Sequence, residues 1–199
     1  MTQNLQKLRD DALRIFQAAV TRVLPQNCIP EQVRRQDDIL EIAGDRYLLP
    51  DYEHIFVIAF GKASVGMFSA LHQILQGMLT RATVITNSLP DRATIPLGEH
   101  IDYFEGSHPL PSEQNVQATA QVIELCRSVG SRDLVIFLIS GGGSSLLFAP
   151  KTGIPPEQYQ SLVNDLMKQG ATIIELNTIR IVLSLGSSSG QRKSPTDGL

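Results

Sequence analysis

Residues 134–145 join an apolar run to three glycines that are flanked by serines. Continuous Val, Ile, Leu and Phe without polar alternation is typical of a strand buried on both faces. Glycines at the end of such a strand permit positive φ and let a ligand approach the backbone. Ligands of open α/β sheets bind beyond the carboxyl ends of strands. We therefore predict a phosphate-binding loop made of Ser140, Gly141, Gly142, Gly143, Ser144 and Ser145.

Lys62 follows a second apolar run, residues 55–60, and precedes small residues that should open a helix. A lysine is unfavourable there, because the dipole at a helix N-terminus repels a cation. An anionic ligand would reverse this balance, since it could bind both the ammonium group and the free N–H groups. We predict that Lys62 binds an anion. The alternative is a surface lysine that extends from its loop into solvent.

Glu105 and His108 lie in a proline-bounded loop that follows a third strand, residues 101–104. A carboxylate and an imidazole in such a place could orient a hydroxyl group or assist proton transfer. The alternative is that His108 and the prolines only fix the loop. The Glu105-x-x-His108 spacing is too common to indicate a metal site, and we expect none. His54 has no companion that would suggest a site.

Familiar nucleotide-binding signatures are missing from both glycine loops. Residues 61–63 lack the upstream glycine and the Ser/Thr of a Walker A loop. Residues 141–146 lack the last glycine of a dinucleotide fingerprint, and no acidic residue ends a strand about 20 residues later. A Gly-x-Ser-x-Gly elbow is also absent, which argues against a serine hydrolase. A serine-rich loop after a strand would suit a regulatory module that binds sugar phosphates equally well.

The elements that must position these residues alternate between strands and helices. Strands are predicted at residues 55–60, 82–86, 101–104 and 134–139, and a short hairpin at 39–49. Helices are predicted at residues 2–24, from residue 63, and at 112–130, 155–170 and 171–183. This order predicts a three-layer, Rossmann-like α/β domain, a mostly parallel sheet flanked by helices, over residues 1–184. Residues 185–199 are rich in Ser and Gly and predict a disordered or aberrant tail.

Composition limits the partners and the compartment. The net charge is −3, which gives no reason to expect nucleic acid or an anionic membrane as partner. No apolar run approaches the ~20 residues that a membrane span needs. Cys28 and Cys126 have no metal spacing and are typical of reduced thiols, so we expect a cytoplasmic protein. The basic, amphipathic start leaves the mitochondrion as the alternative, but Asp10 and Asp11 favour a helix packed on the surface.

Four motifs in a fixed order resemble the type-2 glycerate kinases, the family with a C-terminal MOFRL domain. They are residues 60–63 (Phe-Gly-Lys-Ala), 104–111 (Phe-Glu-Gly-Ser-His-Pro-Leu-Pro), 138–145 (Leu-Ile-Ser-Gly-Gly-Gly-Ser-Ser) and 170–180 (Gly-Ala-Thr-Ile-Ile-Glu-Leu-Asn-Thr-Ile-Arg). The resemblance implies ATP- and Mg²⁺-dependent phosphorylation of D-glycerate, in a cleft between two α/β domains. It also implies that Lys62 is the essential lysine and that residues 141–145 belong to the phosphate-binding region. Glu105, His108 and Arg180 are then candidates for the substrate side.

The chain departs from this family after Arg180, where Ile181 stands in place of a lysine. We therefore expect a truncated form without the MOFRL domain, poorly active or inactive, and we leave its oligomeric state open. One alternative is a non-catalytic isoform or fragment. Another is a hydroxypyruvate or 2-hydroxyacid reductase, although the missing dinucleotide fingerprint argues against it.

Overall fold

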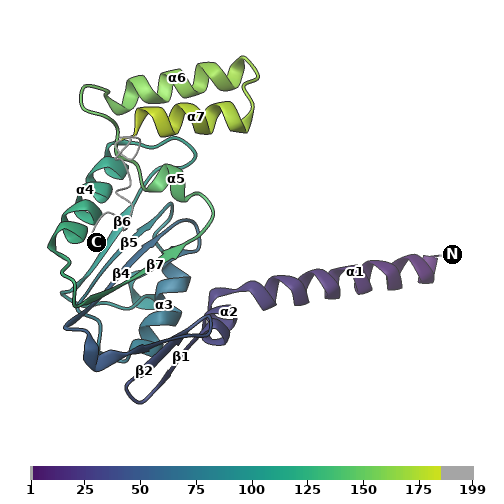
Figure 1. The fold of residues 1–199 in the computed structure, drawn as a ribbon. Helices are drawn as coiled ribbons and strands as arrows, with labels where there is room; N and C mark the ends of the chain where they lie inside the picture. Colours follow the sequence, from purple (N-terminus) through teal and green to yellow (C-terminus); the bar gives the residue numbers. More distant parts are fainter. Residues whose placement is uncertain (1, 185–199) are drawn as a thin grey trace, which may run out of the picture.

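The computed structural model describes residues 2–184, whose central feature is a four-stranded parallel sheet (Figure 1). The strands are β4 (His54–Phe60), β5 (Arg81–Thr86), β6 (Ile101–Glu105) and β7 (Asp133–Ile139), in the order β6-β5-β4-β7. Since all four run parallel, their carboxyl ends share one edge of the sheet. The predicted strands are confirmed, with boundaries shifted by one residue at most.

Helices cover both faces of this sheet, as the alternation of strands and helices predicts. On one face, α3 (Ser64–Leu75) packs over the strands and α2 (Pro25–Gln32) packs against α3; on the other face lies α4 (Glu113–Ser128). Successive strand residues serve different cores: Val57 packs with the α3 side and Ile58 with the α4 side, and both are fully buried. The Rossmann-like α/β prediction is confirmed.

Strand β7 is less buried than its sequence predicts. Phe137 is 50% exposed and Ile139 is 60% exposed. The reason is position: β7 is the last strand of the sheet, and α4 packs mainly over β5 and β6. For the described residues, the prediction that β7 is buried on both faces is therefore wrong. An apolar run does not reveal whether a strand lies inside the sheet or at its edge.

The N-terminal third forms two helices and a small separate sheet. Three antiparallel strands, β1 (Val33–Gln36), β2 (Ile39–Ile42) and β3 (Asp45–Leu48), replace the predicted two-stranded hairpin. The short η1 helix (Leu49–Asp51) leads from it into β4, and η2 (Arg92–Thr94) lies between β5 and β6.

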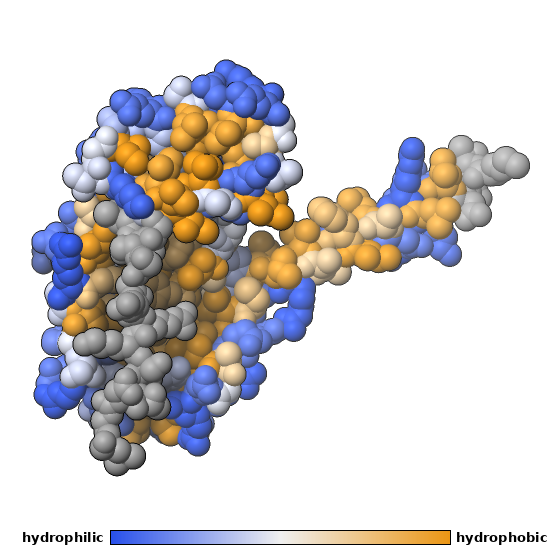
Figure 2. Space-filling view, turned by 45° about the horizontal axis from the view of Figure 1, so that its top comes forward, coloured by the Kyte–Doolittle hydropathy of each residue, from blue (hydrophilic) through white to orange (hydrophobic). Residues whose placement is uncertain are grey.

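Helix α1 (Thr2–Val23) has the predicted length but not the predicted packing. It extends away from the rest of the molecule, and hydrophobic residues run along it (Figures 1 and 2). Ile15 is 71% exposed and Phe16 65% exposed, so the expectation of a packed surface helix is wrong here. Helical spacing of apolar residues produces an amphipathic helix, but it does not specify what covers the apolar face.

Three helices stand at the carboxyl edge of the sheet. A single turn, α5 (Gly143–Leu146), follows β7, and α6 (Pro156–Lys168) and α7 (Ile173–Leu183) lie side by side beyond it (Figure 1). Phe148, which follows α5, and Tyr159 of α6 are buried in one small hydrophobic cluster, with ring centroids 4.4 Å apart. The two predicted helices are confirmed, whereas the tail predicted at residues 185–199 lies outside the described residues. Within residues 2–184 no helix has both the length and the apolar composition needed to cross a membrane.

Candidate functional site

The loops after β4 and β7 contact each other directly. The backbone N–H of Lys62 donates to the Gly141 carbonyl oxygen (2.9 Å), and the Ser140 N–H donates to the Phe60 carbonyl (3.1 Å). The N–H of Ala63 donates to the Ser140 hydroxyl (3.0 Å). Because β4 and β7 are neighbouring parallel strands, their loops leave the sheet side by side. The structure thus brings together the two segments that the sequence singles out.

Two glycines make this close approach possible. Gly61 has φ +121°, and a Cβ there would lie 2.2 Å from the Ser140 hydroxyl oxygen. Gly142 has φ +87°, and a Cβ there would lie 2.9 Å from His108 Cδ2 and 3.4 Å from Lys62 Cγ. The glycine-rich loop, the lysine and the histidine, each from a different strand end, therefore meet at Gly142.

Two of the three serine hydroxyls in the glycine-rich loop have partners within the protein. Ser140 accepts a hydrogen bond from the backbone after β4, and buried Ser145 donates its hydroxyl to the Pro109 carbonyl oxygen (2.8 Å). These two side chains hold loops together. Ser144 is exposed. The Gly143 N–H donates to the Ser140 carbonyl (3.3 Å), which closes the turn into α5.

His108 is influenced by two cations, Lys62 and Arg180. Burial, then Lys62 and then Arg180 lower the pKa of His108 from its ordinary value. Arg180 comes from α7 and also acts on buried Tyr159: burial raises the pKa of the Tyr159 hydroxyl, and the nearby guanidinium opposes that rise. Two cations and a neutral imidazole without an acidic counterpart in this set favour binding of an anion.

Glu105 lies at the same edge but faces a different hollow. Its Oε2 accepts a hydrogen bond from the Leu89 N–H (3.0 Å), which ties the end of β6 to the loop after β5. With His108 and Gln114 it lines a hollow of about 370 Å³. Lys62 lines a neighbouring hollow of about 440 Å³. His108 is common to both parts of the site: it lines the hollow with Glu105, and it lies beside Gly142 together with Lys62.

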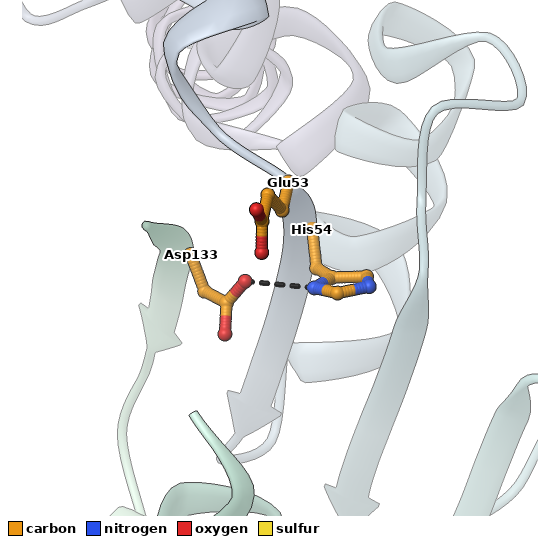
Figure 3. A group of neighbouring side chains, drawn as sticks. All are labelled: Glu53, His54 and Asp133. Atoms are coloured by element: carbon orange, nitrogen blue, oxygen red, sulfur yellow. Dashed lines mark hydrogen bonds and ion pairs between the residues drawn. The ribbon is translucent and has the colours of Figure 1, made fainter. Parts of the chain in front are cut away.

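A second polar cluster lies at the opposite edge of the sheet, where β4 and β7 begin (Figure 3). His54 Nδ1 is 2.8 Å from Asp133 Oδ1, and the two residues are directly paired across the strands. The N–H of Gly130 and then His54 lower the pKa of the Asp133 carboxyl. The expectation that His54 has no companion is therefore wrong. Only strand register could show this pairing, since 79 residues separate the two.

This cluster is distinct from the site formed by Lys62, Gly142 and His108 at the carboxyl edge of the sheet, which we call the loop site. Glu53, His54 and Asp133 have potential metal-ligand atoms within 4.8 Å of one another. Glu53, however, forms an ion pair with Arg132, and both Asp133 oxygens accept hydrogen bonds within the protein. The pairing of β4 with β7 therefore explains why these three side chains lie close together.

Asn115 is not among the residues predicted from the sequence, and the structure places it behind the site. It is completely buried in the first turn of α4, and its side-chain amide bonds to Ser107, Ser112 and Ser145. The one available signal is the Ser112-x-x-Asn115 spacing of a capping box. That spacing predicts the start of a helix but not the contact with Ser145.

Comparison with known proteins gives a consistent result. Residues 11–188 match a family described as "Domain of unknown function (DUF4147)". D-glycerate 2-kinase of Thermotoga maritima is 30% identical over 182 residues, which cover 92% of this chain and 39% of the relative. Glycerate kinase of Danio rerio is 32% identical over 203 residues, 96% of this chain and 40% of the relative. A putative hydroxypyruvate reductase of Agrobacterium vitis is 39% identical over 128 residues, 64% of this chain and 32% of the relative.

Solved structures agree in fold. A protein of Pyrococcus horikoshii OT3 superposes with a TM-score of 0.75 at 29% identity, over 89% of this chain and 39% of that one. Glycerate kinase of Thermotoga maritima superposes with a TM-score of 0.70 at 29% identity, over 90% and 39%. The chain spans about two fifths of the length of the first two relatives and of both structures.

Proposed function

The chain belongs to the DUF4147 family, and from this premise we propose that residues 1–184 form the N-terminal domain of a D-glycerate kinase. In this reaction the γ-phosphoryl group of ATP is transferred to a hydroxyl group of D-glycerate, which yields phosphoglycerate and ADP. Support comes from the relatives named glycerate kinase and from the gathering of Lys62, Gly142 and His108 at one edge of the sheet. A cytoplasmic location remains part of the proposal.

Lys62 and the glycine-rich loop are proposed to bind the phosphates. Phosphoryl transfer depends on positioning and on positive charge around the transferred group. The Lys62 ammonium can supply that charge, while the amides of Gly141, Gly142 and Ser144 can donate to phosphate oxygens. Ser144 is the serine of this loop whose side chain is exposed. Ser140 and Ser145 contribute by holding the loops in place.

We propose that glycerate binds on the side of His108 that faces away from Lys62 and the glycine-rich loop. A neutral His108 can accept or donate a hydrogen bond at the glycerate hydroxyl, and Arg180 can pair with the glycerate carboxylate. Support for both roles comes from the charges of Lys62 and Arg180, which each act to lower the pKa of His108. Glu105 would face the same substrate from the neighbouring hollow.

The groups at this edge fit ATP better than they fit a protein-held metal. Mg²⁺ binds oxygen ligands and in kinases is held by one or two carboxylates together with the phosphates. Glu105 is the carboxylate that ends a strand here, and one of its oxygens already accepts a hydrogen bond. Mg²⁺ would neutralise phosphate charge when it is bound. Glu53 and Asp133 cannot serve this site, because they lie where β4 and β7 begin, at the opposite edge of the sheet.

The convergence at Gly142 carries the proposal, and binding of MgATP tests it. Calorimetric titration of the chain with MgATP should detect binding that Lys62→Ala weakens at least tenfold. Lys168→Ala, at the exposed end of α6, is the control and should bind as the wild type does. A chain that binds no MgATP would contradict the proposal.

A second candidate activity is favoured by the relative named putative hydroxypyruvate reductase. Oxidation of NADH in the presence of hydroxypyruvate measures it directly. We expect none, since the dinucleotide fingerprint is missing. If the chain oxidised NADH and did not bind MgATP, the reductase would replace the kinase as the proposed function.

A further inference from the structure

We propose that Asn115 is a positioning residue: its side-chain amide holds the loop of residues 105–112 against the glycine-rich loop, so that His108 stays beside Gly142 and Lys62. This inference rests on the function proposed above, because it assigns a role within that site. Asn115 itself is too deeply buried to touch a ligand.

Both ends of the Asn115 amide are used. Oδ1 accepts from the backbone N–H groups of Ser107 (2.9 Å) and Ser112 (2.8 Å). Nδ2 donates to the carbonyl oxygens of Ser107 (3.0 Å) and Ser145 (2.9 Å). The planar Asn115 amide therefore joins both ends of the loop of residues 105–112, which we call the histidine loop, to the turn that follows the glycines. An amide suits this place, because it offers two acceptor and two donor positions in one plane.

The surroundings of Asn115 leave little room for adjustment. A Cβ at Gly106 would lie 2.8 Å from Asn115 Nδ2, so the histidine loop can approach this closely only with glycine there. The Ser145 hydroxyl donates to the Pro109 carbonyl (2.8 Å), which adds a second link between the same loops. These links lie on either side of His108 in the chain and fix where its ring can go.

Helix capping alone does not account for this pattern. Oδ1 and Ser112 form the capping box that starts α4. The bond from Nδ2 to Ser145 spans 30 residues and contributes nothing to the helix terminus. A buried donor left unpaired would be costly, so the Ser145 carbonyl is part of what defines the native loop arrangement.

The test uses two variants and a matched control in the 199-residue chain. Asn115→Ser is uncharged and too short to reach Ser145, and Asn115→Ala removes the amide completely. Neither variant adds a charge, so the pKa of His108, measured by NMR, reports burial and the distance from Lys62 and Arg180. Val122→Ala is the control: it lies on the same face of α4, is 5% exposed and packs in the core without touching either loop through a hydrogen bond.

We expect both Asn115 variants to raise the pKa of His108 toward its ordinary value and to weaken binding of pyrophosphate at least tenfold. Val122→Ala should lower Tm without either effect. Asn115 variants that lower Tm but keep the wild-type His108 pKa and pyrophosphate affinity would overturn the proposal. If one variant does not fold, the other decides.

The two proposals fail in different ways. A wild-type chain that binds no pyrophosphate, but in which Asn115→Ser still raises the His108 pKa, would remove the proposed function and leave the positioning role. Loss of pyrophosphate binding with Lys62→Ala, but not with Asn115→Ser or Asn115→Ala, would remove the positioning role and leave the function.

Discussion

Lys62 has the properties of a group that stabilises negative charge during a reaction. Its backbone is fixed by the bond to Gly141, its side chain passes Gly142, and its charge acts on His108. In a longer relative, such as the D-glycerate 2-kinase of Thermotoga maritima, replacement of the aligned lysine by alanine should lower kcat about 10²–10³-fold. Arginine should restore little, because a planar guanidinium differs from a compact ammonium. Near-normal turnover of the alanine variant would show that this lysine is only a solvated surface residue.

Gly142 offers a sharp test, because the chain contains a control glycine with nearly the same φ. Gly142 and Gly153 have φ +87° and +89°, but only a Cβ at Gly142 would meet neighbours, whereas none lies within 4 Å of Gly153. Alanine at either position should cost about 1–2 kcal/mol of unfolding free energy. Only Gly142→Ala should also displace His108 and abolish pyrophosphate binding, measured by calorimetry. Equal binding by both variants would show that the loop does not approach the anion.

At the scale of elements, the register between β4 and β7 positions both edges of the sheet. The same ladder that puts Phe60 opposite Ile139, beside the loop site, puts His54 opposite Asp133 at the other end. The pairing of the two polar residues therefore stabilises the register that brings the loops together.

Acid should weaken that pairing. The pKa of Asp133 is lower in the folded chain than its ordinary value of 3.8, so its contribution to stability is present above that value. It is lost as the pH falls through the lower, folded pKa. Scanning calorimetry from about pH 6 down to about pH 2.5 should show a steeper fall of Tm for the wild type than for Asp133→Asn. Asp102→Asn, an exposed carboxylate paired with Arg81, should follow the wild type. Parallel curves for Asp133→Asn and wild type would contradict the assignment.

For the whole molecule, the described chain leaves much apolar surface in water. Besides α1, the exposed face of β7 and one side of α7 contribute, with Ile173 63% and Ile174 75% exposed. Exposed apolar surface costs roughly 25 cal/mol for each Å², and a domain has a margin of only about 5–15 kcal/mol. Within residues 2–184 the cations that act on His108 are Lys62 and Arg180, and phosphoryl transfer needs charge gathered from several directions.

We therefore expect the purified 199-residue chain to be catalytically inactive and to self-associate. Glycerate-dependent formation of ADP should not exceed the background, and light scattering should show species larger than a monomer. The double substitution Phe137→Thr and Ile139→Thr should reduce association, because both side chains are exposed on β7. Robust turnover by a monodisperse monomer would refute this expectation.

Local sequence patterns were enough to predict most elements and to mark two strand ends as candidate binding sites. Apolar runs set the four strands, and proline, serine and glycine signals set most helix ends, because these effects act within a few residues. The glycines that end β7 and the lysine that ends β4 could be singled out because a strand end followed by such residues has a local meaning.

Which distant residues meet depends on how the elements are arranged in three dimensions. In the folded chain the charges of Lys62 and Arg180 act on His108, and Asn115 bonds to Ser145. The pair of His54 with Asp133 depends on the register between β4 and β7. The exposure of β7 and of α1 was decided in the same way, since an apolar side chain is buried only where another element covers it. Local patterns fix what each segment can be, and the global arrangement fixes what each side chain touches.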